Sequence, residues 1–436
     1  MPEQQEASIF TKVIEHGTIS RSQIIVFVSG ILLNMLDGFD VMAMAFTADP
    51  IGKELGIPAD QLGLVFSSAL AGMMVGAMFV APLSDRWGRR PMILLCTAIL
   101  SLTTLLTGLS TTLWALLPLR FLTGITVGCL LASLAAFVSE YSPSKYRSLA
   151  VVSVTAGYPL GAMMGGFIAD YLIPLHGWES VFYAGSVLTA VMAFLLYGAL
   201  PESLQFLLSK RPDNALQRVN AVLERLNQSS LTELPEQQKQ TAKTKASVWS
   251  LLDGIHRQKT LILWSSFFFC FTCLYFLLSW IPKLVIEAGL SLSEGIYASM
   301  AFNGGGVVGI FLLGWFAAQF GLSRLIGTSL LASVVGMLLF AVASGIDHLI
   351  VYLLLIGVLL QAGFTGLYAV AANIYPTEIR ATGVGWAIGL GRFGAVVGPY
   401  IGGVLIDQQL SMESSFVIFA IPLLVSGLLA YRLRVA

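Results

Sequence analysis

The stretch Leu36-Asp37-Gly38-Phe39-Asp40 places two carboxylates inside an otherwise apolar segment, which covers residues 24–46. In a helix, side chains three residues apart lie on one face, so Asp37 and Asp40 point the same way. The segment is long enough to cross a bilayer, which takes about 20 apolar residues. An acid at that depth costs about 2.5–3.5 kcal/mol on insertion scales. Each carboxylate therefore needs water, a cationic partner or a bound proton.

Two carboxylates this close also repel each other, which favours the binding of a proton. Ionisable groups at membrane depth are functional sites by default. We therefore predict that Asp37 and Asp40 couple transport to protons. The alternative is a buried pair that only ties helices together.

The whole chain has the composition of an integral membrane protein. Of its 436 residues, 56% are hydrophobic and 11% are charged, whereas soluble proteins carry about 25% charged residues. The net charge is zero and no basic tract is present, so no nucleic-acid partner is expected. Residues 1–23 are polar and lack the apolar core of a signal peptide, so the first span is expected to act as an uncleaved insertion signal.

Apolar runs and their breaks predict an all-α polytopic membrane protein with twelve transmembrane helices in two six-helix halves. The expected spans are 24–47, 62–82, 92–110, 113–139, 148–171, 179–199, 260–286, 296–318, 323–344, 349–374, 381–406 and 414–431. The expected domains are a tail at 1–23, a bundle at 24–200, a linker at 201–259, a second bundle at 260–431 and a tail at 432–436. A short amphipathic helix is expected in the linker near residues 215–226.

The placement of Lys and Arg predicts the orientation in the membrane. Of 24 such residues, 20 fall on the side of the N-terminal tail and the linker, and only Lys53 and Lys283 fall on the other side. Arg120 and Arg392 lie inside spans. Because positive residues gather in cytoplasmic loops, both termini are expected in the cytoplasm and the chain in a bacterial inner membrane.

The two halves of the chain contain matching sequence patterns. The pattern Gly161-x-x-x-Gly165-Gly166 in the fifth span matches residues 398–403 in the eleventh, and residues 81–90 match a less regular copy at 314–321. Parallel repeats of this kind place the substrate site near the midplane, at the interface between the halves.

Residues 84–90, Ser-Asp-Arg-Trp-Gly-Arg-Arg, form a charged turn after the second span. The turn resembles the loop signature of the major facilitator superfamily, although Ala81 stands where that signature usually has glycine. The resemblance implies a conformational latch at the cytoplasmic face, made by Asp85, Arg86, Arg89 and Arg90. An anchor that only follows the positive-inside rule is the alternative.

The latch is expected to include Glu140, Arg147 and Glu202 as well. Residues 201–207, Pro-Glu-Ser-Leu-Gln-Phe-Leu, resemble an element that sugar and organic-acid carriers of the superfamily place after the sixth span. Leu204 and Gln205 replace the proline and arginine of that element, which weakens the expected latch. A solvated surface pair of Glu140 and Arg147 is the alternative.

Two cations lie at membrane depth. Arg120 is followed by Gly124 and Gly128, which let another helix pack closely and leave the guanidinium facing the interior. Because it stays charged, Arg120 either pairs permanently with Asp37 or Asp40 or receives a substrate carboxylate. Arg392 lies in Gly-Leu-Gly-Arg-Phe-Gly at residues 389–394. This pattern follows no strand, so it predicts close helix packing rather than a dinucleotide site.

Aromatic and amide side chains complete the expected substrate site. They are Tyr275 in the seventh span, Asn303 in the eighth, Phe364 and Tyr368 in the tenth, and Trp386 in the eleventh. Buried polar groups in membrane helices either bond a neighbouring helix or meet a substrate, and both interpretations hold for Asn303 and Tyr368. Sugar porters carry paired glutamines in the seventh span, and their absence here argues against a hexose. The Gly-Pro that marks antiporters in the fifth span is not matched either, which favours symport.

Three motifs together resemble the aromatic acid:proton symporter family. They are Asp-Gly-Phe-Asp in the first span, Arg120 in the fourth, and Gly-Leu-Gly-Arg-Phe-Gly-Ala-Val-Val-Gly-Pro in the eleventh. The resemblance implies import of benzoate-like acids such as 4-hydroxybenzoate and protocatechuate. The residue types are consistent with such a substrate. Cations inside the membrane can bind an anion, acids there can couple transport to protons, and aromatic side chains can pack on a planar ring. Carriers of muconate, quinate, shikimate or a sugar are the alternatives.

The sequence contains no motif of a hydrolase, nucleotide-binding enzyme or zinc site. No HExxH, GxSxG or Walker pattern occurs, and Cys270 and Cys273 lie mid-span without a second ligand pair. We therefore expect no enzyme activity, no metal and no cofactor, with transport driven by the proton gradient through a monomer. A membrane receptor that binds without net flux is the remaining class.

Overall fold

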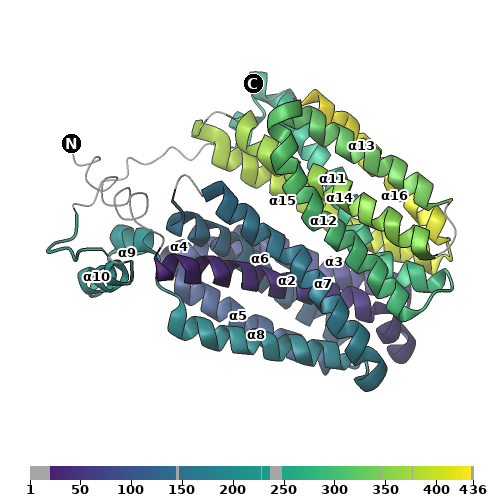
Figure 1. Ribbon diagram of the computed structural model, residues 1–436, viewed down its shortest axis with the longest axis horizontal. Helices are drawn as coiled ribbons and strands as arrows, with labels where there is room; N and C mark the ends of the chain where they lie inside the picture. Colours follow the sequence, from purple (N-terminus) through teal and green to yellow (C-terminus); the bar gives the residue numbers. More distant parts are fainter. Residues whose placement is uncertain are drawn as a thin grey trace.

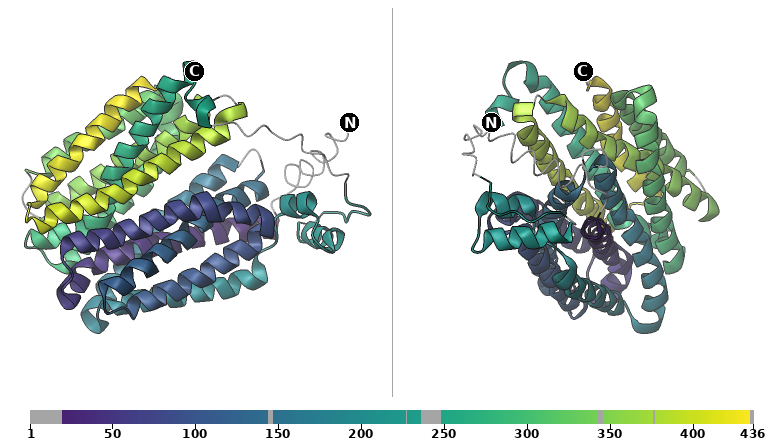
Figure 2. Two further views of the ribbon diagram at one scale, coloured as in Figure 1. Left: turned by 180° about the vertical axis from the view of Figure 1, so that it is seen from behind. Right: turned by 60° about the vertical axis from the view of Figure 1, so that its left-hand side comes forward.

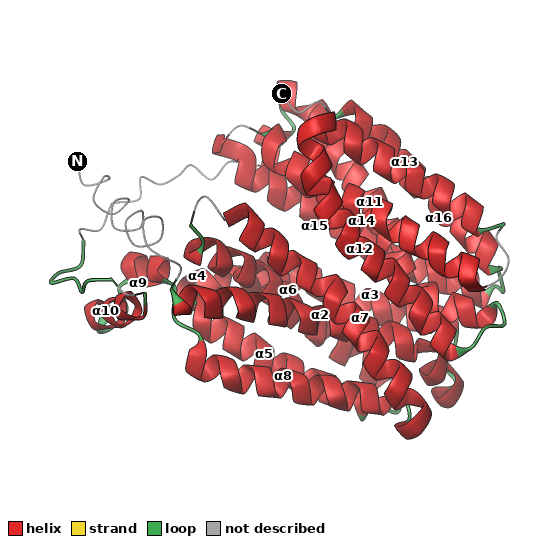
Figure 3. Cartoon of the chain, in the orientation of Figure 1, coloured by secondary structure: helices red, strands yellow, loops and turns green. Residues whose placement is uncertain are grey.

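Twelve long helices form two bundles that lie side by side (Figures 1 and 2). The computed structural model describes residues 20–143, 147–226, 228–235, 248–342, 346–375 and 377–433, and these ranges contain helices and loops but no strand (Figure 3). The first bundle contains α2 (Arg21–Leu55), α3 (Ala59–Val75), α5 (Arg89–Gly108), α6 (Leu113–Tyr141), α7 (Arg147–His176) and α8 (Glu179–Ala199). The second contains α11 (Gly254–Glu287), α12 (Leu292–Phe320), α13 (Leu322–Phe340), α14 (Ile346–Ile374), α15 (Thr377–Asp407) and α16 (Met412–Arg432).

Within the described ranges, eleven helices are long and apolar enough to cross a membrane. The twelfth, α7, has 30 residues, which is about 45 Å of helix and also sufficient for a bilayer. It is rich in glycine and alanine because it packs against helices of both bundles, α2 and α12. The prediction of an all-α membrane protein with two six-helix halves is confirmed.

Local signals explain where the first helices begin and end. Ser20 and Gln23 form a capping box at the start of α2, and Gly56 ends the helix in the left-handed region at φ 64°. The helix therefore extends beyond the predicted span 24–47 at both ends. After Val75, α3 widens into a π-helical turn and continues through residues 81–83 into the short α4 (Ser84–Trp87).

Glycines bring equivalent pairs of helices into backbone contact within the two bundles. The pairs are α2 with α7 and α3 with α6 in the first bundle, and α11 with α15 and α12 with α14 in the second. A Cβ added to one glycine of each pair would almost touch a backbone carbonyl oxygen of the facing helix. The distances are 1.8 Å from Gly161 to the Met35 carbonyl, 1.9 Å from Gly124 to that of Ala69, 2.1 Å from Gly394 to that of Phe268, and 2.1 Å from Gly305 to that of Leu354. The prediction that the glycines after Arg120 and around Arg392 serve helix packing is confirmed.

Polar and aromatic contacts join the two bundles toward one end of the molecule. Lys283 Nζ lies 3.4 Å from Asp49 Oδ1, and the hydroxyl of Tyr297 donates to Asp170 Oδ2 at 2.6 Å. Ser67 Oγ donates to the carbonyl of Val396 at 2.6 Å. The ribbons diverge toward the opposite end, where α4, α9 (Leu204–Lys210) and α10 (Ala215–Arg225) lie (Figures 1 and 2).

The predicted short helix of the linker is confirmed as α10. Its apolar side is buried at Val219, Val222 and Leu223. Ser22 Oγ at the start of α2 donates to the carbonyl of Arg225 at 3.0 Å. The first part of the linker is therefore attached to the first bundle.

We expect Gly161→Ala to destabilise the protein, because the added methyl group meets the Met35 carbonyl and forces α2 and α7 apart. Overpacking of this kind costs about 1–3 kcal/mol. Gly198→Ala is the matched control, since a Cβ there meets nothing within 4 Å. Thermal unfolding in detergent should show a lower midpoint for the first variant only. Equal midpoints would contradict the close approach of α2 and α7.

Candidate functional site

Asp40 and Arg120 form a buried ion pair inside the first bundle. Arg120 Nη1 lies 3.1 Å from Asp40 Oδ2. Thr104 Oγ1 donates to Asp40 Oδ1 at 3.0 Å, and Arg120 Nη2 donates to Thr107 Oγ1 at 3.1 Å. The guanidinium carbon of Arg120 also lies 5.2 Å from the ring centre of Phe182. These contacts come from α2, α5, α6 and α8, so this charge pair belongs to the interior of one bundle.

Of the two roles left open for Arg120, the structure shows the ion pair. The prediction that Arg120 receives a substrate carboxylate stays a prediction, because its guanidinium faces Asp40 here.

Asp37 is buried like Asp40 but has a different environment. Neither of its carboxylate oxygens has a hydrogen-bond partner. Asp40 and Arg392 act on it electrostatically, and the next residue, Gly38, packs on the backbone carbonyl of Tyr158 in α7. A buried carboxylate without a partner is costly unless it holds a proton or meets water or a cation. Asp37 therefore lacks the hydrogen-bonded compensation that Asp40 has.

Arg392 brings a second unsatisfied charge from the other bundle. Its Nε and Nη1 atoms are buried without hydrogen-bond partners. It acts electrostatically on Asp37, Tyr158, Tyr275 and Tyr368. The structure thus brings an acid of α2 and a cation of α15 near each other, and no ion pair joins them. A bidentate carboxylate is the ligand that a guanidinium fork binds best.

Aromatic rings gather around the seventh and tenth predicted spans. The rings of Phe271 and Tyr275 lie parallel with centres 5.8 Å apart. Phe364 packs edge-on against Phe271 at 4.9 Å and against Tyr368 at 5.3 Å. Tyr275, Phe364 and Tyr368 therefore belong to one cluster, joined through Phe271. Trp386 packs instead on Trp264, at 6.2 Å, and no ring contact joins it to this cluster among the described residues.

Two residues of this region are not among the predicted site residues. The hydroxyl of Tyr158 is buried without a partner and lies within electrostatic reach of Asp37 and Arg392. Gln361 shares a face of α14 with Phe364 and Tyr368, and that spacing is visible in the sequence. Asn303, which was predicted, donates to the Ser299 carbonyl at 2.9 Å while its Oδ1 has no partner.

The predicted latch residues meet at the end of the first bundle. Arg89 pairs with Glu140 at 2.6 Å and with Asp85 at 3.2 Å. Glu202 Oε1 accepts the backbone N–H groups of Arg89 and Arg90 at 3.0 and 3.1 Å. Because these N–H groups begin α5, Glu202 caps that helix.

The remaining latch residues differ in their contacts. Arg90 donates to the carbonyl of Tyr197 at 2.6 Å, and Arg86 is exposed. The side chain of Arg147 lies outside the described residues.

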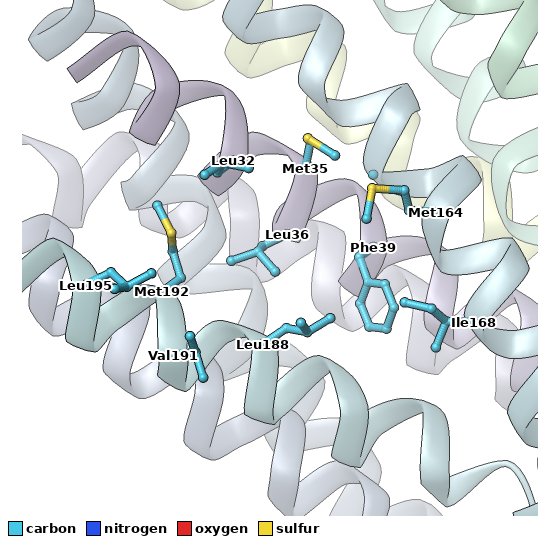
Figure 4. Close-up of a pocket in the computed structure, with 11 residues that line it drawn as sticks. Leu32, Met35, Leu36, Phe39, Met164, Ile168, Leu188, Val191, Met192 and Leu195 are labelled. Atoms are coloured by element: carbon cyan, nitrogen blue, oxygen red, sulfur yellow. The ribbon is translucent and has the colours of Figure 1, made fainter. Parts of the chain in front are cut away.

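A groove between α2, α7 and α8 is apolar throughout (Figure 4). Leu36, Phe39, Met164 and Leu188 are among its lining residues, and none of its lining side chains is polar. The groove has no polar or charged side chain that could bind an anion, and it is not part of the candidate site. In the described part of the chain, no group of three or more His, Cys, Asp or Glu residues could hold a metal ion.

Two six-helix bundles, with the unpaired carboxylate of Asp37 in one and the unpaired guanidinium of Arg392 in the other, define a membrane transporter built from two helical bundles. The profile of the major facilitator superfamily matches residues 30–309 and 263–436. The chain belongs to the major facilitator superfamily, and it is a multi-pass membrane protein. Transporters of this superfamily generally need no cofactor.

Curated relatives are similar over almost the whole chain. A 4-hydroxybenzoate transporter, PcaK, of Acinetobacter baylyi is 34% identical over 94% of this chain and 91% of its own. A gallate transporter of Pseudomonas putida is 33% identical over 95% of this chain and 92% of its own. A benzoate transport protein of Acinetobacter baylyi is 29% identical over 91% of this chain and 86% of its own.

Solved structures show the same fold at low identity. The crystal structure of a D-xylose–proton symporter gives a TM-score of 0.74 at 16% identity, covering 94% of this chain and 97% of that one. A bacterial homolog of the human lysosomal transporter Spinster, in an inward-facing and occupied conformation, gives 0.73 at 16% identity, covering 96% and 97%. These likenesses show the fold alone.

Asp40→Asn should destabilise the protein by about 3–5 kcal/mol, because it leaves the charge of Arg120 buried without a counter-ion. The double variant Asp40→Asn with Arg120→Met should recover most of that loss, since no uncompensated charge remains. The measurement is a double-mutant cycle on the free energy of unfolding. Additive losses would show that the two side chains do not interact.

Proposed function

We propose that this chain imports aromatic carboxylates, such as hydroxybenzoates, together with protons across the bacterial inner membrane. Its relatives, which are named as transporters of 4-hydroxybenzoate, gallate and benzoate, support an aromatic acid as the substrate. The single observation that carries the proposal is the pair of unsatisfied charges, Asp37 of the first bundle and Arg392 of the second. A proton on the acid and a carboxylate on the guanidinium would satisfy both at once.

The two ligands are coupled because their sites act on each other electrostatically. With both sites empty, Asp37 and Arg392 attract each other. A substrate carboxylate at Arg392 would neutralise that cation and remove the attraction that favours ionised Asp37. Binding of the anion therefore favours binding of the proton, and by linkage the proton favours the anion. This reciprocity is the thermodynamic requirement for symport.

Asp40 and Arg120 have a supporting role in this proposal. Their ion pair fixes the face of α2 that presents Asp37, and Asp40 adds a negative charge near it. Asp40 would take part in proton coupling through this field rather than by contact with the substrate. The rings of Tyr275, Phe364 and Tyr368 would hold the planar part of the substrate.

In the proposed orientation, both termini and the linker 201–259 are cytoplasmic, because that side holds most of the Lys and Arg residues. The bundles 24–200 and 260–431 move relative to each other around the site. The contacts of Asp49 with Lys283 and of Asp170 with Tyr297 then close the outer side, and the latch residues act on the cytoplasmic side. We propose a monomer as the transporting unit.

Asp37→Asn should abolish accumulation driven by a pH gradient, because an amide cannot exchange a proton. Exchange of labelled for unlabelled substrate across the membrane should persist, since the carboxylate site at Arg392 remains. Both are measured in proteoliposomes with a panel of benzoates, cyclic hydroxy acids and hexoses. Undiminished proton-driven accumulation would refute the role of Asp37, and uptake confined to non-aromatic acids would refute the substrate class.

Arg392→Gln should raise the KM for aromatic acids by about 10- to 100-fold, which is the loss of a charge-assisted pair worth about 1.5–3 kcal/mol. Arg324→Gln removes an exposed cation from the same bundle and serves as the control. Its KM should stay at the wild-type value. Equal effects of the two substitutions would show that net charge, rather than the site, controls uptake.

A further inference from the structure

Two amide side chains of the second bundle keep polar atoms without partners. Asn303 of α12 is fully buried, and its Oδ1 has no hydrogen-bond partner. Gln361 of α14 is 6% exposed, and its Nε2 has none either. Buried polar atoms in proteins are nearly always hydrogen-bonded, so each exception calls for a ligand, a water or another explanation.

The two amides are neighbours across the contact between α12 and α14. The Nε2 atom of Gln361 lies against Gly306, where a Cβ would stand 2.5 Å away. Gly306 and Asn303 are three residues apart on α12 and therefore lie on one face. Gly304, beside Asn303, comes within 3.4 Å of Met163 in α7, measured from an added Cβ. Helix α12 therefore passes α7 at this level, and the amides lie at the same level on the face of α12 that packs against α14.

The amides also lie in line with the anion site. Gln361, Phe364 and Tyr368 share one face of α14, and Arg392 acts electrostatically on Tyr368. Seven residues of helix separate Gln361 from Tyr368, which is about 10 Å. A benzoate with a hydroxyl opposite its carboxylate, and one hydrogen bond at each end, covers about 12 Å. The ring would then lie beside Phe364.

The solvent exposure of the residues along this face of α14 differs between its two ends. Gln361 is buried, Phe364 and Tyr368 are half-buried, and Ala372 near the end of α14 is exposed. The amides thus lie at the closed end of the face, and the residues beyond Tyr368 lie at its open end. A molecule bound along this face would therefore place the substituent that lies away from the open end against Gln361 and Asn303.

We propose that Gln361 and Asn303 form a hydroxyl site, which selects aromatic acids with a ring hydroxyl opposite the carboxylate. This inference rests on the proposed function. The hydroxyl donates to the Asn303 oxygen and accepts from the Gln361 nitrogen. Exchanging the oxygen and nitrogen of both amides still leaves one donor and one acceptor. A hydroxyl fits such a pair because it does both.

The first test uses the unmodified protein in proteoliposomes and compares 4-hydroxybenzoate, 2-hydroxybenzoate and benzoate. The KM for 4-hydroxybenzoate should be at least about tenfold lower than for the other two, because they leave both amides unpaired. The 2-hydroxy isomer has the same composition but places its hydroxyl beside the carboxylate. Equal KM values for the three acids would overturn the inference and leave the proposed function intact. No uptake of any of them would overturn both.

The second test uses Gln361→Met and Asn303→Leu, which keep the approximate size and remove the amide. In each variant the ratio of the KM values for benzoate and 4-hydroxybenzoate should fall to about one, with the benzoate value unchanged. This ratio does not depend on how much protein folds. Asn373→Leu removes an exposed amide from the same helix and should keep the wild-type ratio. A wild-type ratio in both site variants would overturn the inference, because the amides would then meet only water.

Discussion

Charge inside the membrane must be compensated, and the two acids of the first helix meet this requirement in different ways. Asp40 is held by Arg120 and Thr104 within one bundle, and Thr107 accepts a hydrogen bond from the same guanidinium. The guanidinium of Arg120 pairs with Asp40, and Asp37 has no hydrogen-bonded partner. The cation that acts on Asp37 electrostatically, Arg392, belongs to the other bundle. One paired acid and one unpaired acid make a site that can respond to ions without unfolding the bundle around it.

Glycine makes the rest of this arrangement possible. Two equivalent helix pairs touch backbone to backbone in each bundle, so each half has a frame in which charged side chains have defined neighbours. The aromatic cluster of Phe271, Tyr275, Phe364 and Tyr368 is built on two helices of one frame, and Asp37 and Tyr158 on two helices of the other. The candidate site is therefore completed only where the frames meet.

The sequence predicted the fold well because hydropathy, glycine spacing and the repeat between halves are local patterns. It also predicted Asp37, Arg392 and the ring cluster, since polar and aromatic side chains at membrane depth stand out. It could not decide between the two roles of Arg120, because the choice depends on Thr104, Thr107 and Phe182 of other helices. Tyr158 was missed for the same reason, as its surroundings come from three other helices.

The backbone contact of Gly38 with the carbonyl of Tyr158 has a consequence for how the molecule can be observed. This contact holds α2 against α7 within one bundle, so the Asp37 carboxyl and the Tyr158 phenol would move together when the bundles rock. Asp37 and Arg392 lie in different bundles, so the proposed rocking of the bundles would change their separation. The distance from the Tyr158 phenol to a spectroscopic label on α15 would therefore report the conformation of the transporter.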